Sequence, residues 1–289
     1  KEGTRMQCPV NCLYCMAMKI DSRSKYWNVG ARIGMNKSCT FINRLPQDPP
    51  LKNLGIPWQF LDGEYLGFQG ITDCFWSVYK EDLRWLVQKV SASTIKKLVL
   101  TTKIPITKDQ RSLLHLIKNR LLIVYSVTGL DSLERIKTSE RVQAIRDCKE
   151  DGIDVLPLIH PYIHQASDLS FLKDLQDIGI QEISWKGFRY NPHTMKELSK
   201  HIPEKILSPY NKGTEEEVML GESYLQTLAE EHGMKYVPLR EYIQRPNGQA
   251  GISRELATWE VNNLARQVVF SSSEKDKSAI LQVAIERRL

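Results

Sequence analysis

The sequence contains no uninterrupted apolar run of 18 residues, so no segment is a candidate membrane-spanning helix. Its first residues, KEGTRMQC, include no apolar stretch of the kind found in a secretion signal. They also lack an initiator methionine, as a trimmed product would. These absences favour a cytoplasmic protein with no membrane partner.

Neither sign of charge dominates, because 40 lysines and arginines face 34 acidic residues, for a net charge of +6. This balance permits an anionic substrate or a nucleic acid but requires neither. No cysteine follows Cys148, and three of the six lie in CPVNCLYC (8–15). A tight triplet without a secretion signal favours metal or redox chemistry in a reducing compartment over disulfides.

Short apolar runs typical of strands alternate with segments that have apolar residues at helical spacing. The expected strands are 3–6, 64–70, 95–103, 121–129, 154–163 and 182–190. The expected helices are 81–90, 109–120, 139–152, 168–179, 214–233 and 253–266, and a short strand is expected at 234–239. Residues 22–39 are typical of a loop or short helix.

Six strand–helix units predict an α/β protein with a parallel sheet, either a partial barrel or a doubly wound sheet. In both arrangements, ligand-binding groups gather at the carboxyl ends of the strands. We expect residues 1–199 to form this core. Residues 200–289 are expected to form an α-rich extension packed on it.

The cysteine triplet has the spacing C-x3-C-x2-C, with Tyr14 just before the third cysteine. Three thiolates on one loop can hold three irons of a cubane cluster, leaving the fourth iron free to bind a substrate or cofactor. There are two alternatives. The triplet could form a zinc site with Cys39 as the fourth ligand, or the three cysteines could be reduced and purely structural. Zinc usually uses paired C-x2-C units, and the sequence has no second pair.

This cysteine loop and the strand pattern behind it resemble the radical S-adenosylmethionine (radical SAM) superfamily over residues 3–190. The resemblance implies a partial (β/α)6 barrel in which Cys8, Cys12 and Cys15 bind a [4Fe–4S] cluster. It further implies that the open iron binds S-adenosylmethionine and that reductive cleavage gives a 5′-deoxyadenosyl radical. That radical would abstract hydrogen from an organic substrate. An electron donor such as flavodoxin or ferredoxin would be the partner, and Tyr14 would be a cofactor contact.

The resemblance assigns the cofactor's ammonium to the loop after the second strand, where the superfamily has a GGE-like stretch. Here that loop contains Gln69, Gly70, Thr72 and Asp73, which offer carbonyl groups and a carboxylate. The same residues are equally consistent with a turn that caps the next helix.

Polar side chains also follow the third and fourth strands. Lys103 is suited to the cofactor's carboxylate, or is an ordinary surface lysine. Ser126 and Thr128 lie two residues apart and therefore on one face of a strand, where they could bind ribose hydroxyls or local backbone groups.

The segments ITDCF, LVLTTK, IVYSVTGLD and ERVQAIRDCKEDGIDVLPLIHPYI resemble, in order and style, the spore photoproduct lyase-like branch of the superfamily. By that resemblance Lys103 and Ser126 are cofactor contacts, and Arg141 is a weaker candidate. Members that repair thymine dimers have a hydrogen-donating cysteine where this chain has Gly70. This departure argues against the same repair reaction.

HPYIH (160–164) and WKGFRYNPH (185–193) follow the fifth and sixth strands and are expected to face the same cavity. Tyr162 and Arg189 are the catalytic candidates, since a tyrosine can relay a hydrogen atom and an arginine can bind an anionic group. Each is also consistent with a structural role. The substrate class stays open between a small molecule, a peptide and a nucleic acid. A nucleic-acid base- or lesion-modifying enzyme and a non-catalytic iron–sulfur or zinc regulatory protein are the alternative functions.

Overall fold

A single curved sheet forms the centre of the computed structural model, which describes residues 8–15, 33–35, 40–42, 49–53, 65–68, 72–190, 192–212 and 216–245. Eight strands pair in the order β1-β2-β3-β4-β5-β6-β7-β10, and every pair except β1–β2 is parallel. Their bounds are Ile33–Met35 (β1), Thr40–Ile42 (β2), Tyr65–Phe68 (β3), Lys97–Thr102 (β4), Leu121–Val127 (β5), Val155–Ile159 (β6), Glu182–Trp185 (β7) and Lys235–Tyr236 (β10).

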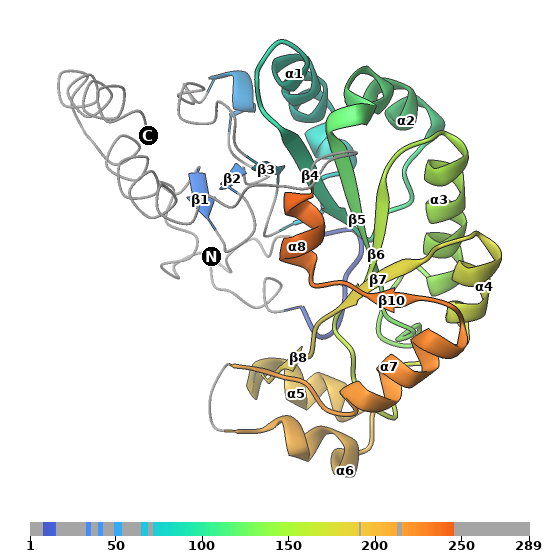
Figure 1. Cartoon of the computed structure of the whole chain (residues 1–289). Helices are drawn as coiled ribbons and strands as arrows, with labels where there is room; N and C mark the ends of the chain where they lie inside the picture. The colour runs from blue at the N-terminus through green and yellow to red at the C-terminus, as the bar shows by residue number, and fades with distance from the viewer. Residues whose placement is uncertain are drawn as a thin grey trace, which may run out of the picture.

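Helices cover the outer face of the sheet, which does not close on itself (Figure 1). They are α1 (Lys80–Ser91), α2 (Lys108–Leu114), α3 (Thr138–Glu150), α4 (Phe171–Asp177) and α7 (Glu222–Glu231). This arrangement confirms the expected α/β class and is consistent with a partial barrel. No helix in the described ranges is both long and apolar enough to cross a membrane.

The apolar runs predicted the central strands correctly, and β3 to β7 lie within the expected ranges. The expected first strand, 3–6, lies outside the described residues. The interpretation of 22–39 as loop or short helix was wrong at Ile33–Met35, which forms β1. The adjoining β2 was missed as well, and it pairs parallel with β3. Apolar runs of three residues are too short to indicate a strand by periodicity.

Two predicted helices are longer than the helices in the structure. The expected helix 109–120 becomes 3₁₀-helical over His115–Arg120, immediately before β5 begins. The expected helix 214–233 begins only at Glu222, and its first part contains a short strand, β9 (Glu217–Val218). Gly221 precedes the helix with φ of 66°, a left-handed conformation that glycine adopts without steric cost. The expected helix 253–266 lies outside the described residues.

A smaller layer lies beyond the carboxyl ends of the strands (Figure 1). It consists of β8 (Phe188–Arg189), paired antiparallel with β9, and of α5 (Pro192–Leu198) and α6 (Glu204–Leu207). Its apolar side chains form a second core together with residues of the cysteine loop, including Val10 and Tyr14. The cysteine loop is therefore packed between this layer and the sheet.

The remaining described helix, α8 (Leu239–Gln244), covers the opposite, inner face of the sheet. Its Ile243 is buried in a separate apolar cluster whose other buried members come from three central strands: Val99, Leu122, Val124, Leu156 and Leu158. The inner face is thus filled by α8 along the amino-terminal half of these strands.

The end of α8 is held by side chains from the amino-terminal ends of the strands. The Tyr65 hydroxyl donates to the Gln244 carbonyl (3.0 Å), and the Lys97 ammonium donates to the Arg245 carbonyl (2.7 Å). The Arg245 guanidinium pairs with Glu182 at 2.7 Å. Burial lowers the pKa of Lys97.

Ile243→Ala is expected to lower the free energy of unfolding by about 3 kcal/mol, the usual cost of truncating a fully buried branched side chain. Urea unfolding followed by circular dichroism measures this loss. Glu241→Ala, an exposed position on the same helix, is the control and is expected to stay within about 0.5 kcal/mol. Equal effects of the two substitutions would contradict the packing of α8 into the sheet.

Candidate functional site

The cysteine loop, residues 8–15, is fixed against the segment that follows β5. Two backbone hydrogen bonds join them, from Leu13 N to Leu133 O (3.0 Å) and from Arg135 N to Val10 O (3.3 Å). The loop therefore lies at the carboxyl-terminal edge of the sheet, where ligand-binding groups gather in parallel α/β folds.

Three free thiols project from this loop. Cys12 is buried, whereas Cys8 and Cys15 are partly exposed, and turns are closed by Asn11 N to Cys8 O (3.1 Å) and Cys15 N to Cys12 O (3.0 Å). Burial raises the pKa of the Cys8 and Cys12 thiols, and nearby Lys103 opposes this at Cys12.

The chemistry of the three thiols is compatible with an iron–sulfur cluster. Within the described ranges, no three His, Cys, Asp or Glu side chains are placed to hold one metal ion. In a cubane cluster each thiolate binds a different iron, so three ligands need not converge on one point. Cys39, the proposed fourth zinc ligand, lies outside the described residues. The donor set thus fits a cluster bound by three thiolates.

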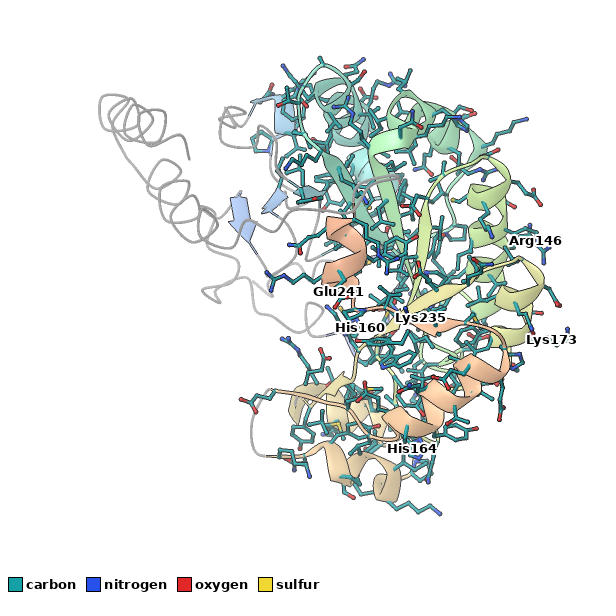
Figure 2. The ribbon with its side chains drawn as sticks, viewed as in Figure 1. Arg146, His160, His164, Lys173, Lys235 and Glu241 are labelled. Atoms are coloured by element: carbon teal, nitrogen blue, oxygen red, sulfur yellow. The ribbon has the colours of Figure 1, made fainter. Side chains whose placement is uncertain are left out.

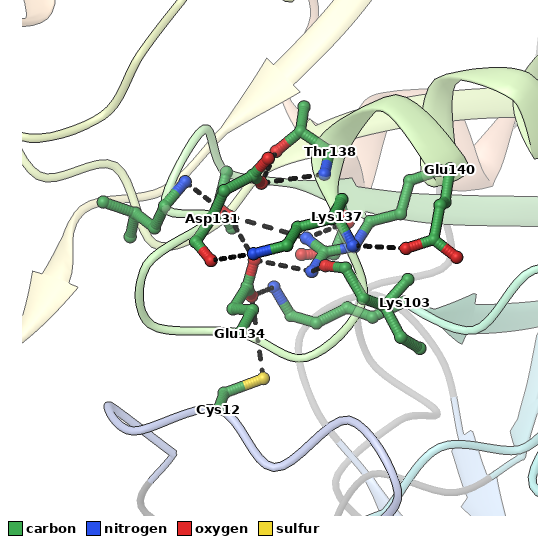
Figure 3. A network of polar contacts seen from close by, with 12 residues as sticks. Cys12, Lys103, Asp131, Glu134, Lys137, Thr138 and Glu140 are labelled. Carbon is green, nitrogen blue, oxygen red and sulfur yellow. Dashed lines mark hydrogen bonds and ion pairs between the residues drawn. The ribbon is translucent and has the colours of Figure 1, made fainter.

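Beside the thiols, the fully buried carboxylate of Glu134 accepts hydrogen bonds from five side chains, four with oxygen or nitrogen donors and the Cys12 thiol (Figure 3). Oε1 accepts from the Tyr14 hydroxyl and from Lys103 Nζ (2.9 Å). Oε2 accepts from Thr128 Oγ1 (2.6 Å) and Arg141 Nη2 (2.5 Å). These partners come from the cysteine loop, the ends of β4 and β5, and α3, so Glu134 joins all of them.

Cys12 approaches the same carboxylate, with its Sγ 3.6 Å from Glu134 Oε1. Burial raises the pKa of Glu134 and lowers that of Lys103 to about 7, although the two groups form an ion pair. The opposing shifts have one cause, the removal of both groups from water.

Lys103 and Ser126 meet at one backbone carbonyl. The Lys103 ammonium donates to His160 O at 3.1 Å and to the Tyr14 hydroxyl at 2.7 Å, in addition to Glu134. Ser126 Oγ donates to the same His160 carbonyl at 2.9 Å. The structure therefore brings Tyr14, Lys103, Ser126 and Thr128, all singled out in the sequence, to one place next to Cys12.

The second-strand loop contributes indirectly. The Asp73 carboxylate accepts hydrogen bonds from Lys103 N (2.7 Å), Thr102 Oγ1 (2.8 Å) and Phe75 N (3.0 Å), so it fixes the turn that carries Lys103. Thr72 Oγ1 donates to the Tyr79 hydroxyl at 2.8 Å. The candidates Gln69 and Gly70 lie outside the described residues.

Neither of the two catalytic candidates forms a hydrogen bond with Glu134 in the described part of the chain. Tyr162 is buried in the main core, the large apolar cluster between the sheet and its outer helices. Its hydroxyl lies 2.9 Å from His164 Nδ1, and burial raises the pKa of Tyr162 to about 12. Figure 2 shows His164 beside α7 and His160 closer to α8. Arg189 is exposed on β8, with its Nε 3.9 Å from the Glu217 carboxylate.

The central carboxylate was missed by the sequence analysis. Glu134 lies in the stretch LDSLERI, which matches no motif, and its hydrogen-bond partner Tyr14 is 120 residues away. Arg141, a weaker candidate from the sequence, is fully buried and contacts Glu134 directly.

No family model and no curated protein matches the chain. Solved structures similar in fold include a spore photoproduct lyase complexed with dinucleoside spore photoproduct. It has 11% identity and a TM-score of 0.38, and the match covers 50% of this chain and 46% of that one. Streptococcus suis SuiB bound to S-adenosylmethionine has 15% identity and a TM-score of 0.46, with 71% and 46% covered.

The chain spans less than half the length of each of these two proteins. A spore photoproduct lyase, from the branch that the sequence resembles, is thus among the solved structures that the chain matches.

Proposed function

We propose that the protein is a radical SAM enzyme in which Cys8, Cys12 and Cys15 hold a [4Fe–4S] cluster. The observation that carries the proposal is the position of three free thiols on one loop at the carboxyl-terminal edge of a parallel sheet. When bound, the cluster would supply the electron that cleaves S-adenosylmethionine to methionine and a 5′-deoxyadenosyl radical.

The chain's own residues would bind and orient the cofactor. Lys103 is a buried cation beside the thiols and is suited to the cofactor's carboxylate. Ser126 and Thr128 place hydroxyls at the end of β5 for the ribose, and Tyr14 places a ring beside the cysteines. The apolar second core behind the loop would keep water from the cluster.

The second-strand loop is proposed to receive the cofactor's ammonium. Its members are Gln69, Gly70, Thr72 and Asp73. The Asp73 carboxylate already accepts hydrogen bonds from two backbone amides and a threonine, so in this proposal the carbonyls of the loop contribute most.

The substrate would lie further out, on the side of β8 and the segment after β6. Arg189 is an exposed cation for an anionic group, and Tyr162 with His164 forms a hydroxyl–imidazole pair. We propose an organic substrate that loses a hydrogen atom, with flavodoxin or ferredoxin as electron donor.

The test is anaerobic reconstitution with iron and sulfide, followed by a strong reductant and S-adenosylmethionine. We expect about four irons per chain and 5′-deoxyadenosine above the level of a reaction without reductant. Stoichiometric zinc without iron, and no deoxyadenosine, would instead support a non-catalytic zinc protein.

A further inference from the structure

The Lys103 ammonium has no proton to spare for a ligand. An ammonium group donates three hydrogen bonds, and Lys103 Nζ already has three acceptors: the Tyr14 hydroxyl (2.7 Å), Glu134 Oε1 (2.9 Å) and the His160 carbonyl (3.1 Å). Any anion that binds Lys103 must therefore displace one of them.

Glu134 is the acceptor that a ligand carboxylate can replace at least cost. The His160 carbonyl also accepts from Ser126 and belongs to the backbone at the end of β6, so it cannot turn away alone. The Tyr14 hydroxyl is neutral, so replacing it would leave two carboxylates beside one ammonium. Exchanging Glu134 Oε1 for another carboxylate oxygen leaves the charge at Lys103 unchanged.

Arg141 offers a place for the displaced oxygen. Its Nη2 donates to Glu134 Oε2, whereas its Nε is buried and has no hydrogen-bond partner among the described residues. An arginine presents its N–H groups as a planar fork that matches a carboxylate with two parallel hydrogen bonds. A rotation of the Glu134 carboxylate onto Nε and Nη2 would satisfy the unpartnered nitrogen and release Lys103. It would also release the Tyr14 hydroxyl and the Cys12 thiol, which now donate to Oε1, for the ligand carboxylate to accept.

We infer that Glu134 occupies the place of the ligand's carboxylate on Lys103 and turns onto Arg141 when the ligand binds. This inference rests on the proposed function, since the ligand it concerns is S-adenosylmethionine. Glu134 would then determine specificity. Only a ligand with a carboxylate can replace the Glu134 oxygen as an acceptor on Lys103, so a ligand without one would leave Glu134 in place.

Glu134→Gln tests the exchange by removing the competing charge. Equilibrium dialysis of the reconstituted protein measures the affinity for S-adenosylmethionine and for decarboxylated S-adenosylmethionine. We expect the variant to bind S-adenosylmethionine about tenfold more tightly, because a charged hydrogen bond no longer has to be broken, and the decarboxylated compound no more tightly than the wild type does. Glu150→Gln, an exposed position on α3, is the control and is expected to leave both affinities unchanged.

Iron content and circular dichroism establish that each variant is folded and loaded. If Glu134→Gln fails this check, Glu134→Asp is used. Its shorter side chain spans Lys103 and Arg141 less well, and we expect about threefold tighter binding of S-adenosylmethionine alone. Unchanged or weaker binding of S-adenosylmethionine, or an equal gain for both compounds, would overturn the inference. A wild-type protein that binds neither compound would remove the proposed function, and the inference with it.

Discussion

Cys12→Ala is expected to abolish 5′-deoxyadenosine formation, reducing it to the level of a reaction without protein. In the proposed assignment each of the three cysteines holds one iron, so the variant keeps two protein ligands for a cluster that needs three. Cys12 is the most buried of the three, and its thiol faces Glu134. The measurements are iron per chain after anaerobic reconstitution, the absorption spectrum, and deoxyadenosine by chromatography.

Cys148→Ala is the matched control, because Cys148 is a free, buried cysteine on α3 that packs in the main core. It is expected to keep wild-type iron content and deoxyadenosine formation, with a loss of about 1–2 kcal/mol in the free energy of unfolding. A Cys12→Ala protein with wild-type iron and turnover would refute the assignment of the cluster to this loop.

Arg141→Met is expected to lower the free energy of unfolding by about 3–5 kcal/mol, the usual cost of removing one partner from a buried ion pair. Methionine keeps most of the apolar volume of the side chain, so the loss reports on charge. Glu134 Oε2 would retain only the Thr128 hydroxyl, and the Ile136 carbonyl would lose the Arg141 donor that lies 2.6 Å away. Denaturant unfolding with an unchanged slope measures the effect.

Arg146→Met on the same helix provides the comparison, since Arg146 is partly exposed and points away from the sheet (Figure 2). It is expected to change stability by no more than about 0.5 kcal/mol. The double variant Arg141→Met/Glu134→Gln should cost less than the sum of its single changes, because the two side chains contact each other. Equal losses for Arg141→Met and Arg146→Met would show that the buried ion pair contributes no stability.

The sequence predicted the parts of the fold that depend on local periodicity. β5 is a run of seven buried residues, Leu121–Val127. Such a run can be recognised as a strand from the local sequence alone. β9 could not be found in this way, because it has two residues and pairs with β8, about 30 residues earlier in the chain. Apolar residues after β9 continue the helical spacing of α7 towards the amino terminus, so the predicted helix 214–233 wrongly included β9.

Two parts of the candidate site could be predicted from the sequence. The spacing of the three cysteines indicates a metal-binding loop, and Lys103 lies at the carboxyl end of a predicted strand. Glu134 could not be predicted. An acidic residue in a connecting segment is ordinarily exposed, and only the folded chain shows that Lys103 and Arg141 meet there. The ion pairs that hold the site together depend on tertiary contacts.

The attachment of α8 also has a mechanical consequence. The end of this helix is held by side chains at the starts of β3, β4 and β7, whereas β10 pairs with β7 over only two residues. A force applied to the chain at Arg245 would therefore be distributed over β3, β4 and β7 through these side-chain contacts. The two-residue pairing of β10 with β7 would then bear only part of the load.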